Sequence, residues 1–299
     1  MTTTRQATDV QTCSLTLWTE PSNRDYRQLS QNWLNAEYYA IAWNLAVHRA
    51  LQLFDTVEIF TDQYGLRYLQ SIGVEPTEFH VTLDELARDR IDPTFWAYGK
   101  IHTYKQLAER GEPFLHIDGD VILGERPNDE LLTRDLWAQN CEAGEWFQRV
   151  YEHPSSFLYK NLPHRPQSWV SQFHRIKMAS CMGIVGGWRT DAFGDYADQA
   201  IELVTHPANQ KVWGRIPRKD WYNTSVEQYT FNLVAADYGI EVGAILGADE
   251  IGRVYSRDDD GGYFHIWGEK KTESVYLDLK GQLLAEAPEK LQTLQDFLR

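Results

Sequence analysis

The stretch Pro113–Leu123, which reads PFLHIDGDVIL, decides how the rest of the chain is interpreted. Its apolar runs Phe114–Ile117 and Val121–Leu123 predict two short buried strands. Asp118 and Asp120 directly follow the first run, at the carboxyl end where open α/β sheets bind their ligands. Alternation along an extended chain points both carboxylates the same way. We therefore expect a ligand-binding edge of a sheet at this point.

The spacing of the two carboxylates favours a divalent cation. Ionised carboxylates a few ångströms apart repel one another, and a divalent ion relieves that repulsion. Gly119 between them lets the backbone bend and lets a bulky ligand approach closely. A solvated turn is the alternative, because Asp and Gly are common turn residues.

The composition fits one large or two small domains with a proper core in an acidic protein. The chain has 299 residues, 42% hydrophobic content and a formal net charge of −14. That charge argues against nonspecific binding to nucleic acid or an anionic membrane, so a phosphate ester needs a metal or local Lys and Arg. The absence of a membrane-spanning run or signal-peptide core predicts a cytoplasmic protein. Cys13, Cys141 and Cys181 are too few for a disulfide framework.

Strand and helix patterns alternate through the first half of the chain, and the second half is less regular. This alternation predicts an α/β fold with a mostly parallel sheet flanked by helices. The predicted strands are Leu15–Trp18, Val57–Phe60, Glu78–Val81, Phe114–Ile117, Val121–Leu123, Trp137–Asn140, Ser180–Gly187, Ile240–Leu246 and Tyr263–Trp267. The predicted helices are Asn32–Phe54, Leu66–Ile72, Thr94–Arg110, Asp191–Val204, Ser225–Tyr238 and Pro288–Leu298.

A histidine and two lysines elsewhere in the chain suit the same site. The segment His265–Lys271 (HIWGEKK) offers an imidazole, which is a good third ligand for a transition metal held by two carboxylates. Lys271 suits a phosphate as a point charge. Lys100 lies on the predicted helix just before the Asp-bearing strand. The alternatives are a hydrogen-bonded strand histidine and exposed lysines.

Two further segments carry candidate residues. The glycines of the strand Ser180–Gly187, including Gly186 and Gly187, leave room for a ligand, and a tight sheet corner is the alternative. Glu227 and Gln228 place a carboxylate and an amide near the start of a predicted helix. An acid there is also favourable to the helix dipole, so a purely structural role is the alternative.

Together these segments resemble the GT-A class of nucleotide-sugar-dependent glycosyltransferases, in which a DxD motif after a core strand holds Mn²⁺ against the donor diphosphate. His265–Lys271 is similar to the HxxGxxK pattern of the glycogenin and lipopolysaccharide galactosyltransferase family. Residues 227–232 (EQYTFN) resemble that family's DQDxLN segment, with Tyr229 in place of the second acid. Met182–Gly187 is similar to the Gly-Gly strand of the blood-group A/B transferase family. The motifs span residues 15–271.

The resemblance implies a single Rossmann-like GT-A domain over residues 1–299, with a nucleotide-sugar-binding half at 1–123 and an acceptor-side half at 124–299. It implies transfer of a hexose from a UDP-sugar, with Mn²⁺ or Mg²⁺ and with retention of configuration, to an unidentified glycan, peptide or small molecule. The implied metal ligands are Asp118, Asp120 and His265. The implied donor-binding residues are Lys100, Lys271, Gly268, Trp18, Asp62, Gly186 and Gly187. The implied catalytic residues are Glu227, beside the anomeric carbon, and Gln228.

The acceptor and three rival functions stay open. His164–Lys177 and Lys211–Tyr222 mix Trp with basic residues, which suits an anionic or sugar-bearing acceptor or an ordinary solvated loop. A metal-dependent phosphohydrolase needs more ligands, for which Asp258–Gly262 is a candidate; a calcium loop or a solvated surface loop is the other interpretation of that segment. A nucleotidyltransferase usually has a Gly-rich basic loop after its first strand, which Thr19–Asn23 does not match. A non-catalytic carbohydrate-binding protein is the third rival.

Overall fold

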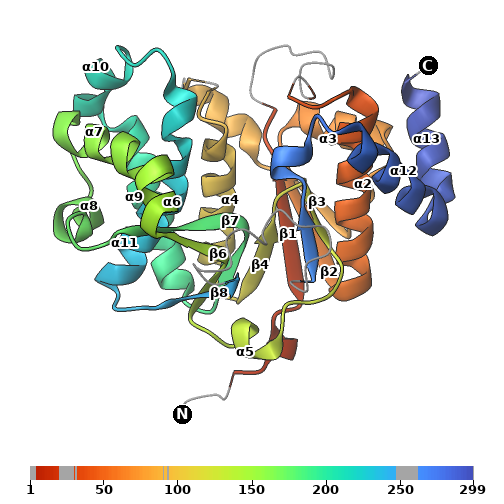
Figure 1. Cartoon of the computed structure of the whole chain (residues 1–299), viewed down its shortest axis with the longest axis horizontal. Helices are drawn as coiled ribbons and strands as arrows, with labels where there is room; N and C mark the ends of the chain where they lie inside the picture. Colours follow the sequence, from red (N-terminus) through yellow and green to blue (C-terminus); the bar gives the residue numbers. More distant parts are fainter. Residues whose placement is uncertain are drawn as a thin grey trace. The chain divides into compact units, whose positions relative to one another are not determined.

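The structure of the protein is a computed structural model that describes residues 5–19, 30, 32–89, 91–92, 94–246 and 262–298. Its strands are β1 Thr12–Leu17, β2 Thr56–Thr61, β3 Glu78–Val81, β4 Phe114–Ile117, β5 Val121–Leu123, β6 Leu136–Ala143, β7 Met178–Gly187, β8 Val242–Leu246 and β9 Tyr263–His265. They form a seven-stranded mixed sheet with the order β3-β2-β1-β4-β7-β6-β8 and a separate β5-β9 ribbon (Figure 1). Helices flank the sheet, so the predicted α/β class is confirmed.

The chain divides into two compact units that alternate along the sequence. The first unit contains Met1–Val10, Arg88–Leu115 and Pro127–Ile251. The second unit contains Gln11–Ala87, His116–Arg126 and Gly252–Arg299. The division therefore falls within β4.

The second unit is built on three parallel strands. β1 pairs with β2 and β2 pairs with β3, so that Leu15 lies beside Ile59 and Ile59 beside Phe79. Nearly all of β2 is buried, as expected for an inner parallel strand. Its helices are α2 Ala36–Leu53, α3 Gln63–Ser71, η8 Trp267–Glu269, α12 Glu273–Glu286 and α13 Pro288–Leu298, and the division after Ala87 falls within η2 Leu83–Asp89.

Helix α2 begins later than the apolar spacing from Asn32 predicts, because Asn35 caps it. The Asn35 side chain accepts a hydrogen bond from the Tyr38 N–H, which satisfies one of the free donors of the first turn. Helix α12 was not predicted from the sequence. It packs against α2 and α13 through Val275, Leu279 and Leu283, while Leu277 and Leu284 stay exposed and blur the helical period.

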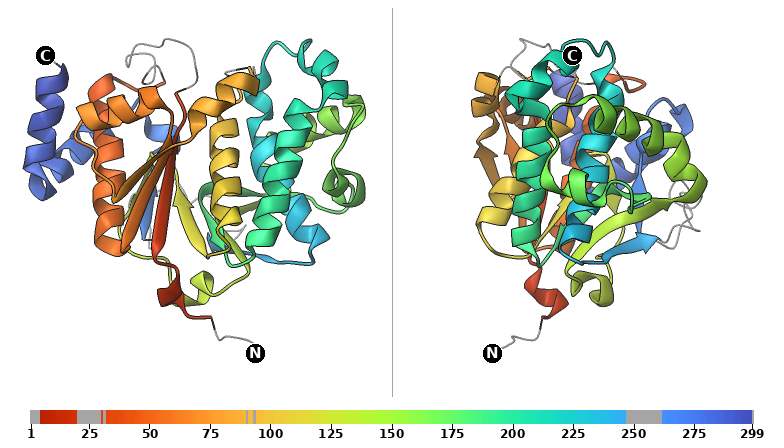
Figure 2. Two further views of the ribbon diagram at one scale, coloured as in Figure 1. Left: turned by 180° about the vertical axis from the view of Figure 1, so that it is seen from behind. Right: turned by 90° about the vertical axis from the view of Figure 1, so that its left-hand side faces the viewer.

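The first unit joins antiparallel and parallel strands. β6 runs antiparallel to β7 and parallel to β8, with a register shift between Ala138 and Asn140. Helices α4 and α9 pack against one another (Figure 2). The helices of this unit are η1 Ala7–Asp9, α4 Ala97–Glu109, α5 Asp129–Leu132, α6 Gly144–Phe147, η3 Gln148–Glu152, α7 His153–Asn161, α8 Gln167–Gln172, α9 Thr190–Thr205, η4 Pro207–Asn209, α10 Gln210–Trp213, η5 Lys219–Tyr222, η6 Ser225–Tyr229 and α11 Thr230–Asp237.

Two helical segments of the first unit, η3 and η6, are single turns of π-helix. A π turn inserts an extra residue into a helix and is frequently found at functional sites. Among the residues that the structure describes, no helix combines the length and the apolar content that crossing a bilayer requires.

Candidate functional site

Three side chains from distant parts of the second unit come together as the sequence predicts. Asp118 and Asp120 directly follow β4, and His265 is the last residue of β9. One potential ligand atom from each of the three lies within 4.8 Å of the other two. This arrangement brings two carboxylates and one imidazole to a single point, and we call it the Asp-Asp-His cluster.

The β5-β9 ribbon is what carries His265 to the aspartates. β5 and β9 are antiparallel, with Val121 opposite His265. The Ile266 N–H donates to the carbonyl oxygen of Asp120 at 2.9 Å, and the Gly124 N–H donates to the Gly262 carbonyl at 2.7 Å. Backbone hydrogen bonds therefore fix the ribbon at both ends, and the register places the imidazole beside the Asp120 carboxylate.

The Asp-Asp-His cluster is largely shielded from solvent. The side chain of His265 is 5% exposed and that of Asp120 is 12% exposed. His265 Nε2 lies 3.5 Å from Asp120 Oδ1, which is long for a hydrogen bond. Two ligands of one ion bound at about 2.1 Å lie roughly 3.0–3.5 Å apart, so the spacing suits a shared cation. Among the described residues, the buried His265 Nδ1 has no hydrogen-bond partner.

Lys270, which was not selected from the sequence, pairs with Asp120. Its Nζ lies 2.6 Å from Asp120 Oδ2 and 5.2 Å from the centroid of the Trp33 ring. Burial alone would raise the pKa of Asp120, but the charges of Lys270 and His265 outweigh burial and hold that pKa well below its usual range. The HxxGxxK pattern selects Lys271, whose ammonium instead donates to the carbonyl oxygen of Trp33. The only sequence feature that pointed to Lys270 was its position directly before Lys271.

The two glycines of this region have different surroundings. At Gly119, a Cβ atom would lie 2.4 Å from Cζ2 and 2.5 Å from Cε2 of the Trp43 indole. The glycine of the DGD motif therefore makes room for a buried tryptophan of α2, where we expected it to admit a ligand. At Gly268 no atom of the described residues lies within 4 Å of the corresponding position.

Replacing Gly119 by alanine is expected to destabilise the protein by about 1–3 kcal/mol, because the indole of Trp43 would have to move out of a packed core. Gly281 is the matched control. It lies within α12, and in the part of the chain that the structure describes no atom lies within 4 Å of the point that an added Cβ would occupy. Its replacement by alanine should stabilise the protein by about 0.5–1 kcal/mol. Urea unfolding of both variants measures the difference, and equal effects of the same sign would contradict the packing role.

Trp18 and Asp62, expected near the nucleotide, lie at the carboxyl ends of β1 and β2. Asp62 is the N-cap of α3, where its carboxylate accepts from the Gly65 N–H at 2.7 Å. It also accepts from the Thr19 N–H at 2.6 Å and from the Thr19 hydroxyl at 2.7 Å. The carboxylate of Asp62 therefore ties the end of β1 to the start of α3.

Gly186 and Gly187 are explained by packing inside the first unit. A Cβ on Gly186 would lie 2.2 Å from the Phe114 carbonyl oxygen, and one on Gly187 would lie 2.4 Å from the Asp135 carbonyl oxygen. The Trp137 indole also closes over Gly186. We expected this space to admit a ligand, but backbone and indole atoms fill it.

Lys100 and Glu227 pair with one another in the first unit. Lys100 Nζ lies 2.7 Å from Glu227 Oε1 and donates to the Met182 carbonyl at 3.2 Å. The side chain of Glu227 is fully buried and that of Lys100 is 9% exposed. The partner of Lys100 is thus a carboxylate of its own unit, where the sequence led us to expect a diphosphate.

Gln228 joins a second buried group of polar side chains that was not predicted from the sequence. The Tyr151 hydroxyl is within hydrogen-bond reach of Glu142 Oε2 and of Gln228 Oε1. Burial raises the pKa of Tyr151 well above its usual value, and the Glu142 carboxylate raises it further, so the hydroxyl stays protonated and donates. Tyr151 lies on the π turn η3, and Glu227 and Gln228 lie on the π turn η6. A π turn has no sequence signature that would have revealed this group.

The two segments expected to meet an acceptor contain both core and surface tryptophans. Trp169 is fully buried, and its indole N–H donates to Thr230 Oγ1 at 3.0 Å. Trp213 is buried, whereas Trp221 is 63% exposed with the Arg218 guanidinium 4.9 Å from its ring centroid. Asp258, Asp259 and Asp260 lie outside the described residues.

The fold and the Asp-Asp-His cluster define an α/β protein with a candidate metal centre. The chain belongs to the family described as "Family of unknown function (DUF6734)", whose sequence model matches residues 12–297. No curated protein matches the sequence. Among solved structures the chain is similar to one titled "PaToxG Glycosyltransferase", with a TM-score of 0.32 and 9% identity over 95% of this chain and 78% of that chain. A likeness of that size supports no functional inference, so function has to be inferred from the residues.

Proposed function

We propose that this protein is a metal-dependent glycosyltransferase that moves a hexose from a UDP-sugar to an acceptor, with retention of configuration. The observation that carries the proposal is the convergence of Asp118, Asp120 and His265 at the end of a sheet strand. The resemblance of the DGD and HxxGxxK segments to GT-A enzymes supplies the reaction.

The donor atoms of the Asp-Asp-His cluster fit Mn²⁺ or Mg²⁺. Carboxylate oxygens suit both ions, and imidazole is a common ligand of Mn²⁺-like transition metals. His265 Nε2 lies 3.5 Å from Asp120 Oδ1, a spacing that two ligands of one ion can have. A bound ion would supply a Lewis acid that stabilises the departing nucleoside diphosphate.

The chain's own residues would bind the donor and stabilise its leaving group. Lys270 already holds a positive charge 2.6 Å from Asp120, and it would shift toward a diphosphate once a cation neutralised that carboxylate. Lys271 and the open position at Gly268 follow on the same segment and would contact the phosphates. Trp18 and Asp62 directly follow the strands β1 and β2, and we assign them to the nucleotide.

We propose Glu227 as the carboxylate that stabilises the oxocarbenium-like transition state, with Gln228 beside it. Glu227 is fully buried and faces Lys100, so its negative charge is balanced inside the protein before substrate arrives. Tyr151 joins Gln228 to Glu142, which restrains the amide of Gln228. These contacts orient the side chains of the π turn η6.

The proposal is tested by a thermal-shift screen of nucleotide sugars with and without Mn²⁺. A ligand at 100 times its Kd stabilises the native state by about 2.7 kcal/mol, which raises the Tm by several degrees. We expect one UDP-sugar to do so only when Mn²⁺ is present, and to be consumed when acceptors are added. Hydrolysis of simple phosphoesters without any nucleotide-sugar response would favour a phosphohydrolase, and UDP binding without turnover would favour a binding protein.

Glu227→Gln is expected to lower the transfer rate at least about 100-fold and to leave Mn²⁺-dependent UDP affinity within about twofold, because the charge that it removes would stabilise the substrate only in the transition state. Glu152→Gln, on the exposed face of the other π turn, is the control and should keep the full rate. Steady-state rates and calorimetry of folded protein measure both quantities. A Glu227→Gln variant with an undiminished rate would show that Glu227 has no chemical role.

A further inference from the structure

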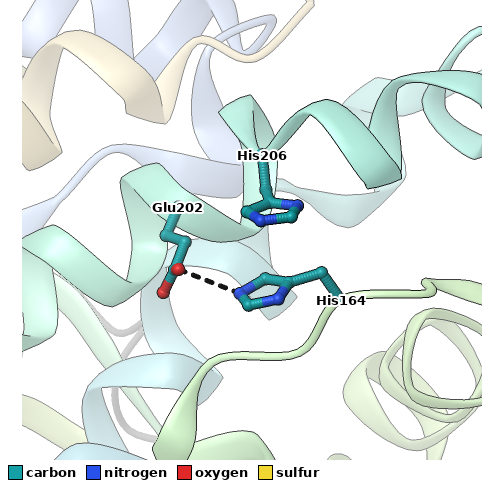
Figure 3. Close-up of side chains that lie close together, drawn as sticks. All are labelled: His164, Glu202 and His206. Atoms are coloured by element: carbon teal, nitrogen blue, oxygen red, sulfur yellow. Dashed lines mark ion pairs between the residues drawn. The ribbon is translucent and has the colours of Figure 1, made fainter.

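The first unit contains a second group of potential metal ligands, formed by His164, Glu202 and His206 (Figure 3). One ligand atom from each lies within 4.8 Å of the other two. The three residues are half-buried, and none of them is used in the proposed transfer reaction. We call them the His-Glu-His cluster.

Two of the three ligands are held by one helix. Glu202 lies in the last turns of α9, and His206 is the C-cap residue of the same helix. Residues four apart on a helix lie on the same face, so the carboxylate and the imidazole project to one side. His164 comes from the loop between α7 and α8 and places its ring over that of His206, with centroids 3.7 Å apart (Figure 3).

A buried asparagine fixes the loop that carries His164. Asn209 is fully buried, and its Oδ1 accepts from the His164 N–H at 3.0 Å. Its Nδ2 donates to the His164 carbonyl and to the Leu203 carbonyl, both at 3.0 Å. The backbone of His164 is therefore tied to the same stretch of α9 that carries the other two ligands, before any ion is present.

One nitrogen of the cluster lacks a hydrogen bond although it is buried. His164 Nε2 forms an ion pair with Glu202 Oε1 at 2.9 Å (Figure 3), and among the described residues it makes no hydrogen bond. A buried ring nitrogen without a hydrogen bond is costly in a protein interior. The His164 nitrogen and the Glu202 oxygen are thus about as close together as two ligands of one ion, and no hydrogen bond of this nitrogen has to break for coordination.

We propose that the His-Glu-His cluster binds one divalent transition-metal ion of the Zn²⁺ class. Two imidazole nitrogens and one carboxylate oxygen form a donor set typical of zinc sites with three protein ligands, which leave a fourth position open to water or another group. The set differs from the oxygen-rich Asp-Asp-His cluster, so the two sites are expected to prefer different ions.

Binding requires two small changes in the side chains. The rings are nearly parallel, at 13°, so one of them has to turn about its second side-chain torsion before both nitrogens face one ion. The distribution of that torsion angle in histidines is broad, so the ring turns at little cost. His206 Nδ1 accepts a 3.2 Å hydrogen bond from the Ala208 N–H, and coordination through either ring nitrogen replaces this long bond.

The test is a Zn²⁺ titration by calorimetry of the full chain carrying Asp118→Asn and Asp120→Asn, which silences the other cluster. We expect one Zn²⁺ site, weakened at least about 100-fold by His164→Gln, by His206→Gln or by Glu202→Gln. His174→Gln is the matched control, because His174 is an exposed histidine of the same unit, and it should leave the site unchanged. His80→Gln tests the group of Glu58, Glu78 and His80 and should also have no effect.

X-ray absorption at the zinc edge of the same protein should show two imidazole ligands and one carboxylate. Glu202 is partly exposed, so Glu202→Gln is expected to fold even if a histidine variant does not, and circular dichroism checks each variant. The proposal is overturned if the parent protein binds no Zn²⁺, if Glu202→Gln binds it with unchanged affinity, or if His80→Gln removes the site.

Discussion

Asp120→Asn should abolish Mn²⁺-dependent binding of UDP, with an affinity at least about 100-fold below that of the unchanged protein. Replacing groups that merely support a metal ligand costs 10–100-fold in metal affinity, so removing a direct ligand should cost at least the upper end. The change also leaves the Lys270 ammonium without the carboxylate that lies 2.6 Å from it. Calorimetry of UDP binding, with and without Mn²⁺, measures the effect.

The control for this variant is Asp55→Asn, an exposed aspartate of the same unit, which should bind UDP normally. His265→Gln should behave like Asp120→Asn, because it removes the third ligand while keeping a side chain of similar size. Unchanged Mn²⁺-dependent affinity in Asp120→Asn would refute the metal assignment. An equal loss in Asp55→Asn would show that the effect comes from net charge.

Lys100→Met should destabilise the protein by about 3–5 kcal/mol, because it leaves a fully buried carboxylate without its ammonium partner. Met keeps most of the length of the side chain, so the lost free energy of unfolding comes from removal of the charge and not from a cavity. The double variant Lys100→Met with Glu227→Leu removes both charges and should regain most of the stability. Urea unfolding of the single and double variants gives the coupling free energy.

Lys105 on the same helix provides the comparison for Lys100. Its Nζ lies 2.5 Å from Asp198 Oδ1, but the two side chains are 37% and 60% exposed. Exposed pairs contribute about 0–1 kcal/mol, so Lys105→Met should change the unfolding free energy little. If both lysine variants lose the same free energy of unfolding, burial is not the reason that the Lys100–Glu227 pair stabilises the protein.

The elements with a clear hydrophobic period were predicted accurately from the sequence. Predicted and observed bounds agree for β3, β4, β5 and α13, and the apolar runs of β4 and β5 are each followed by a polar or glycine-containing turn. Capping by Asn35 shortened α2, because a side-chain cap overrides apolar spacing at a helix end. Helix α12 was missed because its exposed leucines hide its buried face.

The meeting of Asp118, Asp120 and His265 was predicted from motif chemistry, and the structure adds the ribbon that produces it. The group with which each lysine pairs was harder to predict. Whether a lysine meets a phosphate or a carboxylate depends on three-dimensional neighbours, so the pairs of Lys100 with Glu227 and of Lys270 with Asp120 were not foreseen. His164 was noted only as the edge of an acceptor segment, because its cluster depends on the fold of a loop.

The late position of β9 along the chain has a consequence for synthesis. A nascent chain emerges from the ribosome with its N-terminal segments first, so the Asp118–Asp120 turn is made well before Tyr263–His265. Imidazole and ammonium reach Asp120 on one segment, since Lys270 follows His265 closely. A nascent chain that has not yet reached residue 265 therefore has the two aspartates without the imidazole of His265. The Asp-Asp-His cluster can form only after His265 has been synthesised.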